Sequence, residues 1–211
     1  MKKTLLLLTA GATFFAACNG GGDNTVETKE AGDAAEATVE SVTYTVDTAA
    51  STLHWHGEKA AYGHDGTIQV QSGQLTVEGD KINSGTFTVD MSTIEENEDS
   101  YESKDKAKKL EGHLMSEDFF NAEKYPTSTF EITNVKADSI SGNLTIKDIT
   151  KEIKFPADVK MNGDTLHAFA DFTINRADWN VKYGSKSFFD LAADKIISND
   201  IAYKVELVAT K

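Results

Sequence analysis

Three of the five histidines of this chain fall within eleven residues, in the stretch LHWHGEKAAYGHDG at positions 53–66. Histidines spaced as H-x-H can share a zinc ion, but a catalytic zinc site needs a third protein ligand and an open position. On a β-strand, His54 and His56 point to one face while Leu53 and Trp55 point to the other. If Trp55 faces the interior, both imidazoles face solvent. The chain has no H-E-x-x-H motif and no Cys/His cluster, so we expect no metal site.

Two histidines, the last of these three and one farther along the chain, are candidates for a local polar contact or for a ligand contact. His64 lies between glycines in GHDG, and His113 follows a glycine in EGHL. The two could be neighbours at one end of the fold, where an enzyme would combine them with an acidic residue as acid and base. The chain contains no G-x-S-x-G motif and no glycine-rich phosphate loop. We therefore expect binding rather than catalysis.

The N-terminal residues predict export and anchoring. Residues 1–17 carry two lysines and then an apolar run that is too short to span a bilayer, as in a signal peptide. Cys18, the only cysteine, follows small residues in FAAC, which is typical of a lipoprotein whose cysteine is acylated. Residues 18–41 are rich in Gly, Ala, Thr and Glu, which predicts a flexible tether. Residues 42–211 are long enough for one domain with its own core.

The charge of the chain argues against several partners. It has 34 acidic and 21 basic residues, a formal net charge of −13. Binding to nucleic acid needs clustered Lys and Arg, so we do not expect it. Anionic phospholipid would repel such a domain, so the anchor at Cys18 would have to hold it at the membrane. We expect a location in the cell envelope, at the outer membrane and facing the periplasm or the surface. The sequence leaves open whether the protein forms a homodimer.

Apolar and polar residues alternate with a period of two along most of residues 42–211, which is typical of β-strands. Turn-forming sequences such as QSG, EGDK, KADS and MNGD separate the segments. Short strands with hairpin spacing predict an antiparallel sandwich or barrel. The expected strands span residues 43–47, 51–56, 66–71, 74–79, 84–91, 128–135, 139–147, 152–159, 166–174 and 201–209.

One charged region interrupts the alternation. In SKDKAKKLEGHL, residues 103–114, Ala107, Leu110 and Leu114 recur at helical spacing and form a narrow apolar stripe. Ser103 is the expected N-cap. The region predicts one short helical insertion between strands.

Several longer segments, taken in order, resemble the YceI-like family of lipid- and polyisoprenoid-binding proteins. The resemblance covers nearly all of residues 42–211. Its segments are GHLMSEDFFNAEKYP (112–126), YPTSTFEI (125–132), GNLTIKDITKEIKFPADV (142–159), FTINRADWNVKYGS (172–185) and IAYKVELVA (201–209).

The resemblance implies an all-β fold, an elongated eight-stranded antiparallel barrel that is lipocalin-like in shape, with one short helical insertion. Its interior would hold a polyisoprenoid or similar long apolar lipid, for example a quinone precursor, with the polar end group at the mouth and no other cofactor. Carriage, storage or protection of that lipid is the implied role. About eight strands leave room for one slender ligand, which aromatic walls bind by burying its apolar surface. The residues expected to contact it are Trp55, His64, Phe87, His113, Phe119, Phe130, Phe155, Phe169, Phe172, Arg176, Asp178 and Trp179.

Arg176 and Asp178 have two interpretations. They form a structural ion pair that closes the barrel, which we favour, or Arg176 contacts an anionic head group such as a pyrophosphate. Two other functions also stay open. One is a structural or partner-binding lipoprotein whose barrel is packed solid, and the other is a hydrolase-like enzyme that uses His64 and His113 at the barrel mouth.

Overall fold

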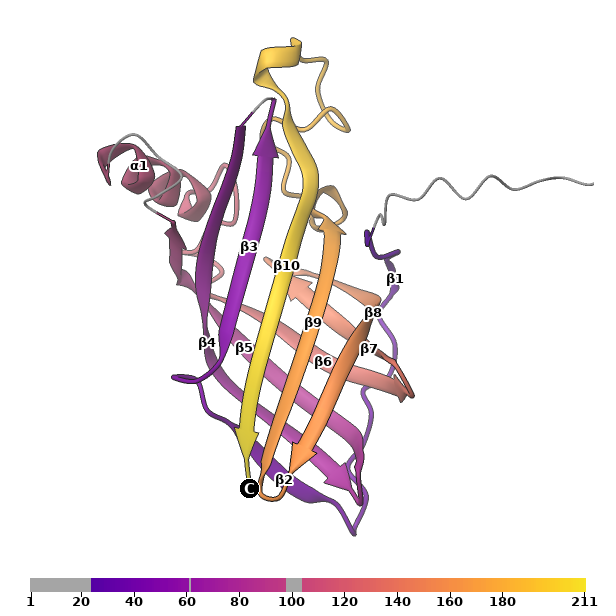
Figure 1. Cartoon of the computed structure of the whole chain (residues 1–211). Coiled ribbons are helices and arrows are strands. Elements are labelled where there is room, and N and C mark those ends of the chain that lie inside the picture. The colour runs from indigo at the N-terminus through magenta and orange to yellow at the C-terminus, as the bar shows by residue number, and fades with distance from the viewer. Residues whose placement is uncertain (1–23, 61, 98–103) are drawn as a thin grey trace, which may run out of the picture.

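A closed ring of eight antiparallel strands forms the body of the protein in the computed structural model, which describes residues 24–60, 62–97 and 104–211 (Figure 1). The ring runs from β3 in chain order to β10, which pairs back onto β3. This confirms the elongated barrel that the resemblance implies. The expected signal peptide, Cys18 and Ser103 lie outside the described residues. The elements are β1 (Lys29–Glu30), β2 (Val42–Val46), β3 (Thr52–Lys59), β4 (Tyr62–Glu78), β5 (Lys81–Glu96), α1 (Lys104–Met115), β6 (Thr127–Lys136), β7 (Ser139–Ile146), β8 (Ile149–Asn162), β9 (Thr165–Asn175), the 3-10 turns η2 (Arg176–Trp179) and η3 (Ala193–Lys195), and β10 (Ile197–Thr210).

Strands of unequal length close the ring because some of them pair with one neighbour along part of their length and with another along the rest. β2 and β3 follow one another at the same place in the ring, joined by a turn at residues 47–51. Both strands therefore pair with β4 and with β10. β8 pairs with β7 through residues 149–156 and with β9 through residues 157–162. The first half of β8 and the second half of β9 therefore diverge.

β4 is one strand of 17 residues where the sequence predicts two. The QSG segment, expected to be a turn, lies at a bulge, because the register against β5 shifts between Val70 and Ser72. A bulge adds a residue and bends a strand without ending it. The turns expected at EGDK, KADS and MNGD do join consecutive strands.

Alternation along the strands separates the interior from the outer surface. The strand β9 shows the pattern clearly, with even-numbered side chains inside and odd-numbered ones outside. At the end of the barrel that holds β2, the interior is filled by almost fully buried residues. These are Tyr44, Val46, Val77, Leu166 and Ala209.

The segment before the barrel lies against it, whereas the sequence predicts a flexible tether there. The N–H of Val26 donates to the carbonyl of Thr173 in β9 (2.8 Å), and β1 pairs with β8. The segment thus bridges the diverging halves of these two strands (Figure 1). Farther on, the side-chain amide of Asn143 donates to the carbonyl of Gly32 (2.8 Å) and accepts from its N–H (2.9 Å).

This segment has few large apolar residues to bury, and backbone hydrogen bonds help to hold it against the barrel. The N–H of Ala35 donates to the carbonyl of Ile132 (2.8 Å) at the place where a bulge in β6 leaves that carbonyl available. Val26 and Ala35 also pack against the core. Few large apolar residues are therefore enough to dock the described part, residues 24–41.

The predicted helix is α1, which lies beside the upper end of the barrel (Figure 1). Ala107 and Leu114 are buried and Leu110 packs against the core, so the apolar stripe faces the barrel. No helix within the described residues combines the length and the apolar character that crossing a membrane requires.

Candidate functional site

The barrel encloses an apolar cavity of about 380 Å³. Every strand of the ring and helix α1 contribute to its wall. Pockets for small molecules commonly measure about 300–1,000 Å³ and are mostly apolar. The titratable side chains of the wall other than Tyr183 and Tyr203 gather at the end nearest α1, which we call the mouth. They are Lys59, His64, His113, Arg176 and Asp200; Glu58 also belongs to the wall at this end, but its carboxylate turns outward to His56 (3.6 Å).

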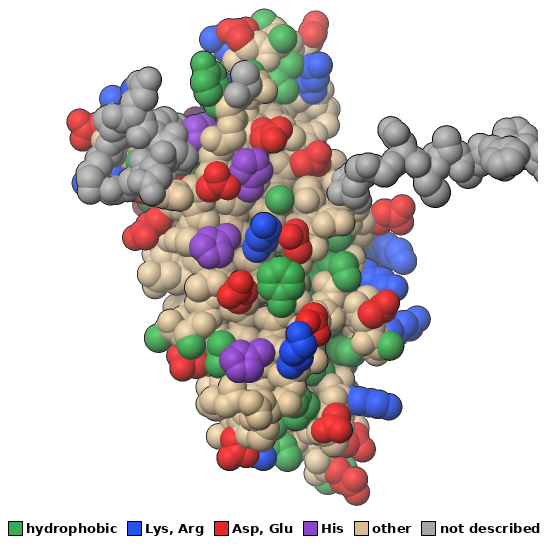
Figure 2. Space-filling view, in the orientation of Figure 1, with side chains coloured by type: hydrophobic (Ala, Val, Ile, Leu, Met, Phe, Trp, Pro, Cys, Tyr) green, Lys and Arg blue, Asp and Glu red, His purple; other side chains and the backbone are tan. Residues whose placement is uncertain are grey.

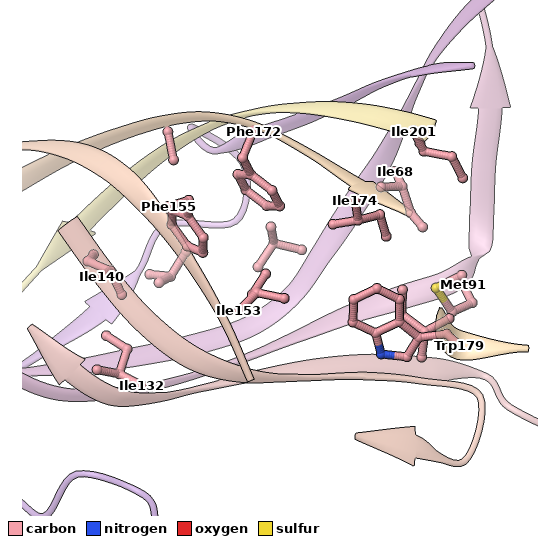
Figure 3. Packing of buried hydrophobic residues seen from close by; sticks show 14 of the residues in the cluster. Ile68, Met91, Ile132, Ile140, Ile153, Phe155, Phe172, Ile174, Trp179 and Ile201 are labelled. Atoms are coloured by element: carbon pink, nitrogen blue, oxygen red, sulfur yellow. The ribbon is translucent and has the colours of Figure 1, made fainter. Parts of the chain in front are cut away.

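Five aromatic rings from five strands form a continuous row along the cavity wall, which we call the aromatic belt. Phe87 lies 6.3 Å from Phe130, and Phe130 lies 5.4 Å from Phe155, measured between ring centres. Phe155 and Phe172 stack at 4.4 Å with their planes 13° apart (Figure 3), and Tyr203 follows at 5.8 Å from Phe172. Such pairs are favourable beyond their burial of area. The four predicted phenylalanines of this belt all line the cavity.

Tyr203 brings one hydroxyl into these apolar surroundings. No hydrogen bond joins this hydroxyl to a residue that the structure describes, although the side chain lines the cavity. Burial raises the pKa of the Tyr203 phenol well above its ordinary value, because the charged form would lose its hydration. The group is therefore a hydrogen-bond donor directed at whatever fills the cavity.

Two other predicted aromatics line the cavity outside the belt. Trp55 lies over Gly66, where a Cβ atom would collide with the indole ring, and its Nε1 donates to the carbonyl of Thr67 (3.3 Å). Phe119 lines the mouth and packs edge-on against Phe120 at 5.3 Å between ring centres. Both were expected in contact with a ligand, and both face the cavity.

Two predicted aromatics do not contribute inward side chains to the cavity. Phe169 belongs to the cavity wall, but its side chain lies on the outer face of β9 and is 43 % exposed. It is three residues from Phe172, so a period of two places the two rings on opposite faces. Trp179 is fully buried beside Met91 (Figure 3), and its Nε1 donates to the carbonyl of Leu144 (3.0 Å). It is absent from the cavity wall, so its role is core packing.

The two candidate histidines both lie at the mouth. His64 Nδ1 is 2.9 Å from Oε1 of Glu96, whose side chain is fully buried. The ring of His113 meets that of Tyr183 edge-on at 4.5 Å, and its Nε2 is 4.0 Å from Asp118. Sequence reasoning missed Glu96, because a single acid among many in this chain carries no signal.

Arg176 is held by backbone carbonyls, so the expected ion pair with Asp178 does not form. Asp178 instead accepts a hydrogen bond from Thr28 Oγ1 (2.8 Å). Burial lowers the pKa of Arg176 to about 10, which leaves it charged at neutral pH, and its guanidinium lies 4.9 Å from the ring centre of Phe119. Its donors reach the carbonyls of Ser198 (2.9 Å), Val181 (2.6 Å), Tyr183 (2.9 Å) and Ile197 (3.2 Å).

The outer histidines form surface contacts, as expected. His56 Nδ1 lies 2.8 Å from Asp65 Oδ1 on the outside of the barrel, and His54 is exposed. Within the described ranges, no group of three or more His, Cys, Asp or Glu side chains could hold a metal ion.

The comparisons with known proteins agree with this architecture. The model of the YceI-like domain matches residues 44–209. A UPF0312 protein of Pseudomonas aeruginosa strain LESB58 is 46 % identical over 56 residues, 25 % of this chain and 29 % of the relative. Protein YceI of Escherichia coli O157:H7 is 43 % identical over 56 residues, with the same coverage of 25 % and 29 %. The chain thus aligns with less than a third of the length of these relatives.

Two solved structures share the fold. BcnA of Burkholderia cenocepacia has a TM-score of 0.60 at 24 % identity, covering 78 % of this chain and 99 % of BcnA. A polyisoprenoid binding domain from Saccharophagus degradans, implicated in plant cell wall breakdown, has a TM-score of 0.57 at 14 % identity, covering 79 % and 97 %. With the family match over residues 44–209, the barrel and its order of strands identify the chain as a member of the YceI-like domain family.

Proposed function

We propose that this protein binds a polyisoprenoid or similar long apolar lipid inside the barrel, for carriage, storage or protection. The observation that carries the proposal is the apolar cavity, which is lined by the whole ring of strands and has its charged residues at one end. The similarity in fold to a polyisoprenoid binding domain supports the same ligand class. A barrel packed solid, as a purely structural lipoprotein would have, does not agree with a cavity of about 380 Å³.

The aromatic belt narrows the class of ligand. An apolar chain satisfies the phenylalanines, but it leaves the hydroxyl of Tyr203 without a hydrogen bond. An unsatisfied buried hydroxyl costs about 1–3 kcal/mol. A prenylated molecule that carries an acceptor oxygen, such as a quinone, removes that cost. We therefore favour an oxygen-bearing prenyl lipid over a plain hydrocarbon.

We propose binding without catalysis. His64 is engaged by the buried carboxylate of Glu96, and His113 packs between aromatic rings. The rival hydrolase predicts an activity that rises or falls near the ordinary histidine pKa of about 6.5. That activity would disappear in both His64→Gln and His113→Gln, whereas our proposal expects no hydrolysis of prenyl esters by either variant or by the wild type.

We also propose that Cys18 is acylated and that the protein belongs to the cell envelope, at the outer membrane. The supporting pattern is FAAC after an apolar run. Two or more acyl chains anchor stably where one chain gives marginal binding. Globomycin treatment, which blocks removal of lipoprotein signals, should leave a larger and diacylated precursor; an unchanged mass after treatment would contradict the anchor.

The function is tested by mass spectrometry of an organic extract from the purified chain that begins at Asn19. This chain keeps every residue that the structure describes, so it keeps the fold. A prenyl lipid or quinone at close to one per protein supports the proposal. A protein that is purified empty and that takes up no added prenyl lipid overturns it.

A further inference from the structure

The rim of the cavity mouth carries large aromatic side chains that point into solvent. Tyr62, at the tip between β3 and β4, is 73 % exposed. The connection between η2 and β10 adds Tyr183 (44 %), Phe188 (41 %) and Phe189 (49 %). We call these four residues the aromatic rim.

The aromatic rim belongs to the same end of the barrel as the mouth. Ala60 and Lys59 of the β3–β4 tip contact the start of β10, through a hydrogen bond from the N–H of Ala60 to the carbonyl of Ile196 (3.2 Å) and the pairing of Lys59 with Ile197. Tyr183 itself lines the cavity. The connection stands above the ends of the strands (Figure 1), so the rim is the outermost surface that a ligand passes on leaving the mouth.

The charge at the rim differs from that of the whole chain. Residues 181–196 contain three lysines and two aspartates, whereas the chain as a whole has a net charge of −13. Lys182 lies over the ring of Phe188, with Nζ 5.1 Å from its centre. Figure 2 shows hydrophobic side chains at this end, with both basic and acidic side chains beside them. An anionic surface therefore repels this end less than other faces.

The start of the described chain also lies near the mouth. The carbonyl of Asn24 accepts a hydrogen bond from the N–H of Thr173 (3.0 Å), two residues before the end of β9. Five residues separate Cys18 from Asn24, which makes six steps along the chain, and a fully extended chain spans at most about 3.6 Å per step. An acyl group on Cys18 can therefore lie no farther than about 22 Å from Asn24.

We propose that the aromatic rim docks onto the surface of a phospholipid bilayer, with the mouth facing the membrane. Aromatic side chains favour the interface between water and membrane, and Lys side chains reach past them to the phosphates. The opposite end of the barrel is packed, so the mouth is the exit for a long lipid. The inference rests on the proposed function, because docking here lets a poorly soluble lipid pass between bilayer and cavity without crossing water.

The test uses the chain from Asn19, without acyl groups, and vesicles of phosphatidylcholine with phosphatidylglycerol. The double variant F188S/F189S removes two of the exposed rings of the aromatic rim. Phe169→Ser is the matched control, since Phe169 is a phenylalanine of equal exposure on the outer wall. We expect the wild type and F169S to float with vesicles alike, and the rim variant to lose at least about tenfold in partition, because the rings bury apolar area in the interface.

A tryptophan at the rim gives a second measurement. The emission of Phe188→Trp should shift to the blue when vesicles are added, and that of Phe169→Trp should not. Wild-type protein that stays in solution with vesicles, or equal losses in F188S/F189S and F169S, overturns the docking surface. If the rim instead recognises a partner protein, vesicles alone give neither flotation nor a blue shift.

The proposed function is measured separately in the same variants. Prenyl lipid delivered from cyclodextrin should bind F188S/F189S as it binds the wild type, because neither phenylalanine lines the cavity. Transfer of the same lipid out of vesicles should slow at least about tenfold, in line with the lost partition. If the wild type takes up no prenyl lipid from cyclodextrin, the lipid-binding function is contradicted. If the wild type takes up the lipid but does not bind vesicles, only the docking is contradicted.

Discussion

The hydroxyl of Tyr203 is the residue-scale feature that separates an oxygen-bearing ligand from a hydrocarbon. In Tyr203→Phe the belt keeps its ring but loses the donor. One neutral hydrogen bond contributes about 0.5–1.5 kcal/mol, which corresponds to a loss of roughly two- to tenfold in affinity. Titration of tryptophan fluorescence should show this loss for a prenyl quinone and no loss for a saturated hydrocarbon of equal length. Equal effects on both ligands would contradict a hydrogen bond to the ligand.

The same hydroxyl predicts a spectroscopic signature in alkaline solution. Burial raises its pKa, so between the ordinary value of about 10 and the raised value the unfolded chain has lost the proton and the folded chain keeps it. The contribution of Tyr203 to stability therefore falls as the pH rises above about 10. Arg176, whose pKa burial lowers to about 10, acts in the opposite direction, so unfolding alone cannot isolate Tyr203. Absorbance at 295 nm should instead show that Y203F lacks the late-ionising tyrosine of the wild type.

Arg176 holds the connection that forms the rim against the start of β10, because two of its four carbonyl partners lie in the connection and two in β10. In Arg176→Met those carbonyls lose a charged donor, and each buried polar group left without a partner costs about 1–3 kcal/mol. We expect the free energy of unfolding in urea to fall by about 3 kcal/mol, since some carbonyls regain water. Arg176→Lys should lose less, because an ammonium keeps the charge and three donors. An unchanged urea midpoint in R176M would contradict this structural role.

At the scale of the elements, the period of two predicted the strands because each has one face in the core and one in water. The pattern of β10 also carries Tyr203, which has Ile201 and Val205 as inward neighbours, so this residue could have been found from alternation. The same alternation would have excluded Phe169 from the residues expected to contact the ligand, because it lies on the outer face of β9. The bulge in β4 was not predictable, because Ser and Gly favour bulges and turns alike. The four carbonyl partners of Arg176 could not be predicted, because they depend on the path of the connection between η2 and β10, which no local sequence pattern specifies.

Docking of residues 24–41 was missed for a related reason. Its contacts are long-range backbone hydrogen bonds, which leave no signature in composition. Asn143 is its principal side-chain partner, with two hydrogen bonds to Gly32. Asn143→Ala should release this part of the segment, so amide exchange in residues 28–36 should accelerate and the free energy of unfolding should fall by about 1–3 kcal/mol. Asn134→Ala, on the exposed face of β6, is the control and should leave both unchanged. Slow exchange in N143A would show that the backbone contacts suffice.

At the scale of the whole molecule, one end of the barrel is packed and the other is lined with charged residues, so a ligand enters along one axis. Small side chains keep that axis open next to the belt. They are Ala157, Ala168 and Ala170, from β8 and β9. A cavity between alanines and bulky aromatic rings lowers the stability of the fold, because the atoms that line a void lose van der Waals contacts on that side. Such a void is consistent with selection for a ligand rather than for stability.

The last prediction therefore fills the cavity. Ala168→Phe places a ring in the open axis, while His167→Phe adds the same ring one residue away on the outer face of β9. A ligand that binds only the folded state stabilises it by about 2.7 kcal/mol at a concentration of 100 times Kd. In thermal unfolding, added prenyl lipid should raise the Tm of the wild type and of H167F but not of A168F. Without lipid, A168F should unfold at the same temperature as the wild type or above it, provided that the ring fits the void without strain. A lipid-dependent rise in Tm for A168F equal to that of the wild type would place the ligand outside the barrel, and the aromatic belt would then be ordinary core packing.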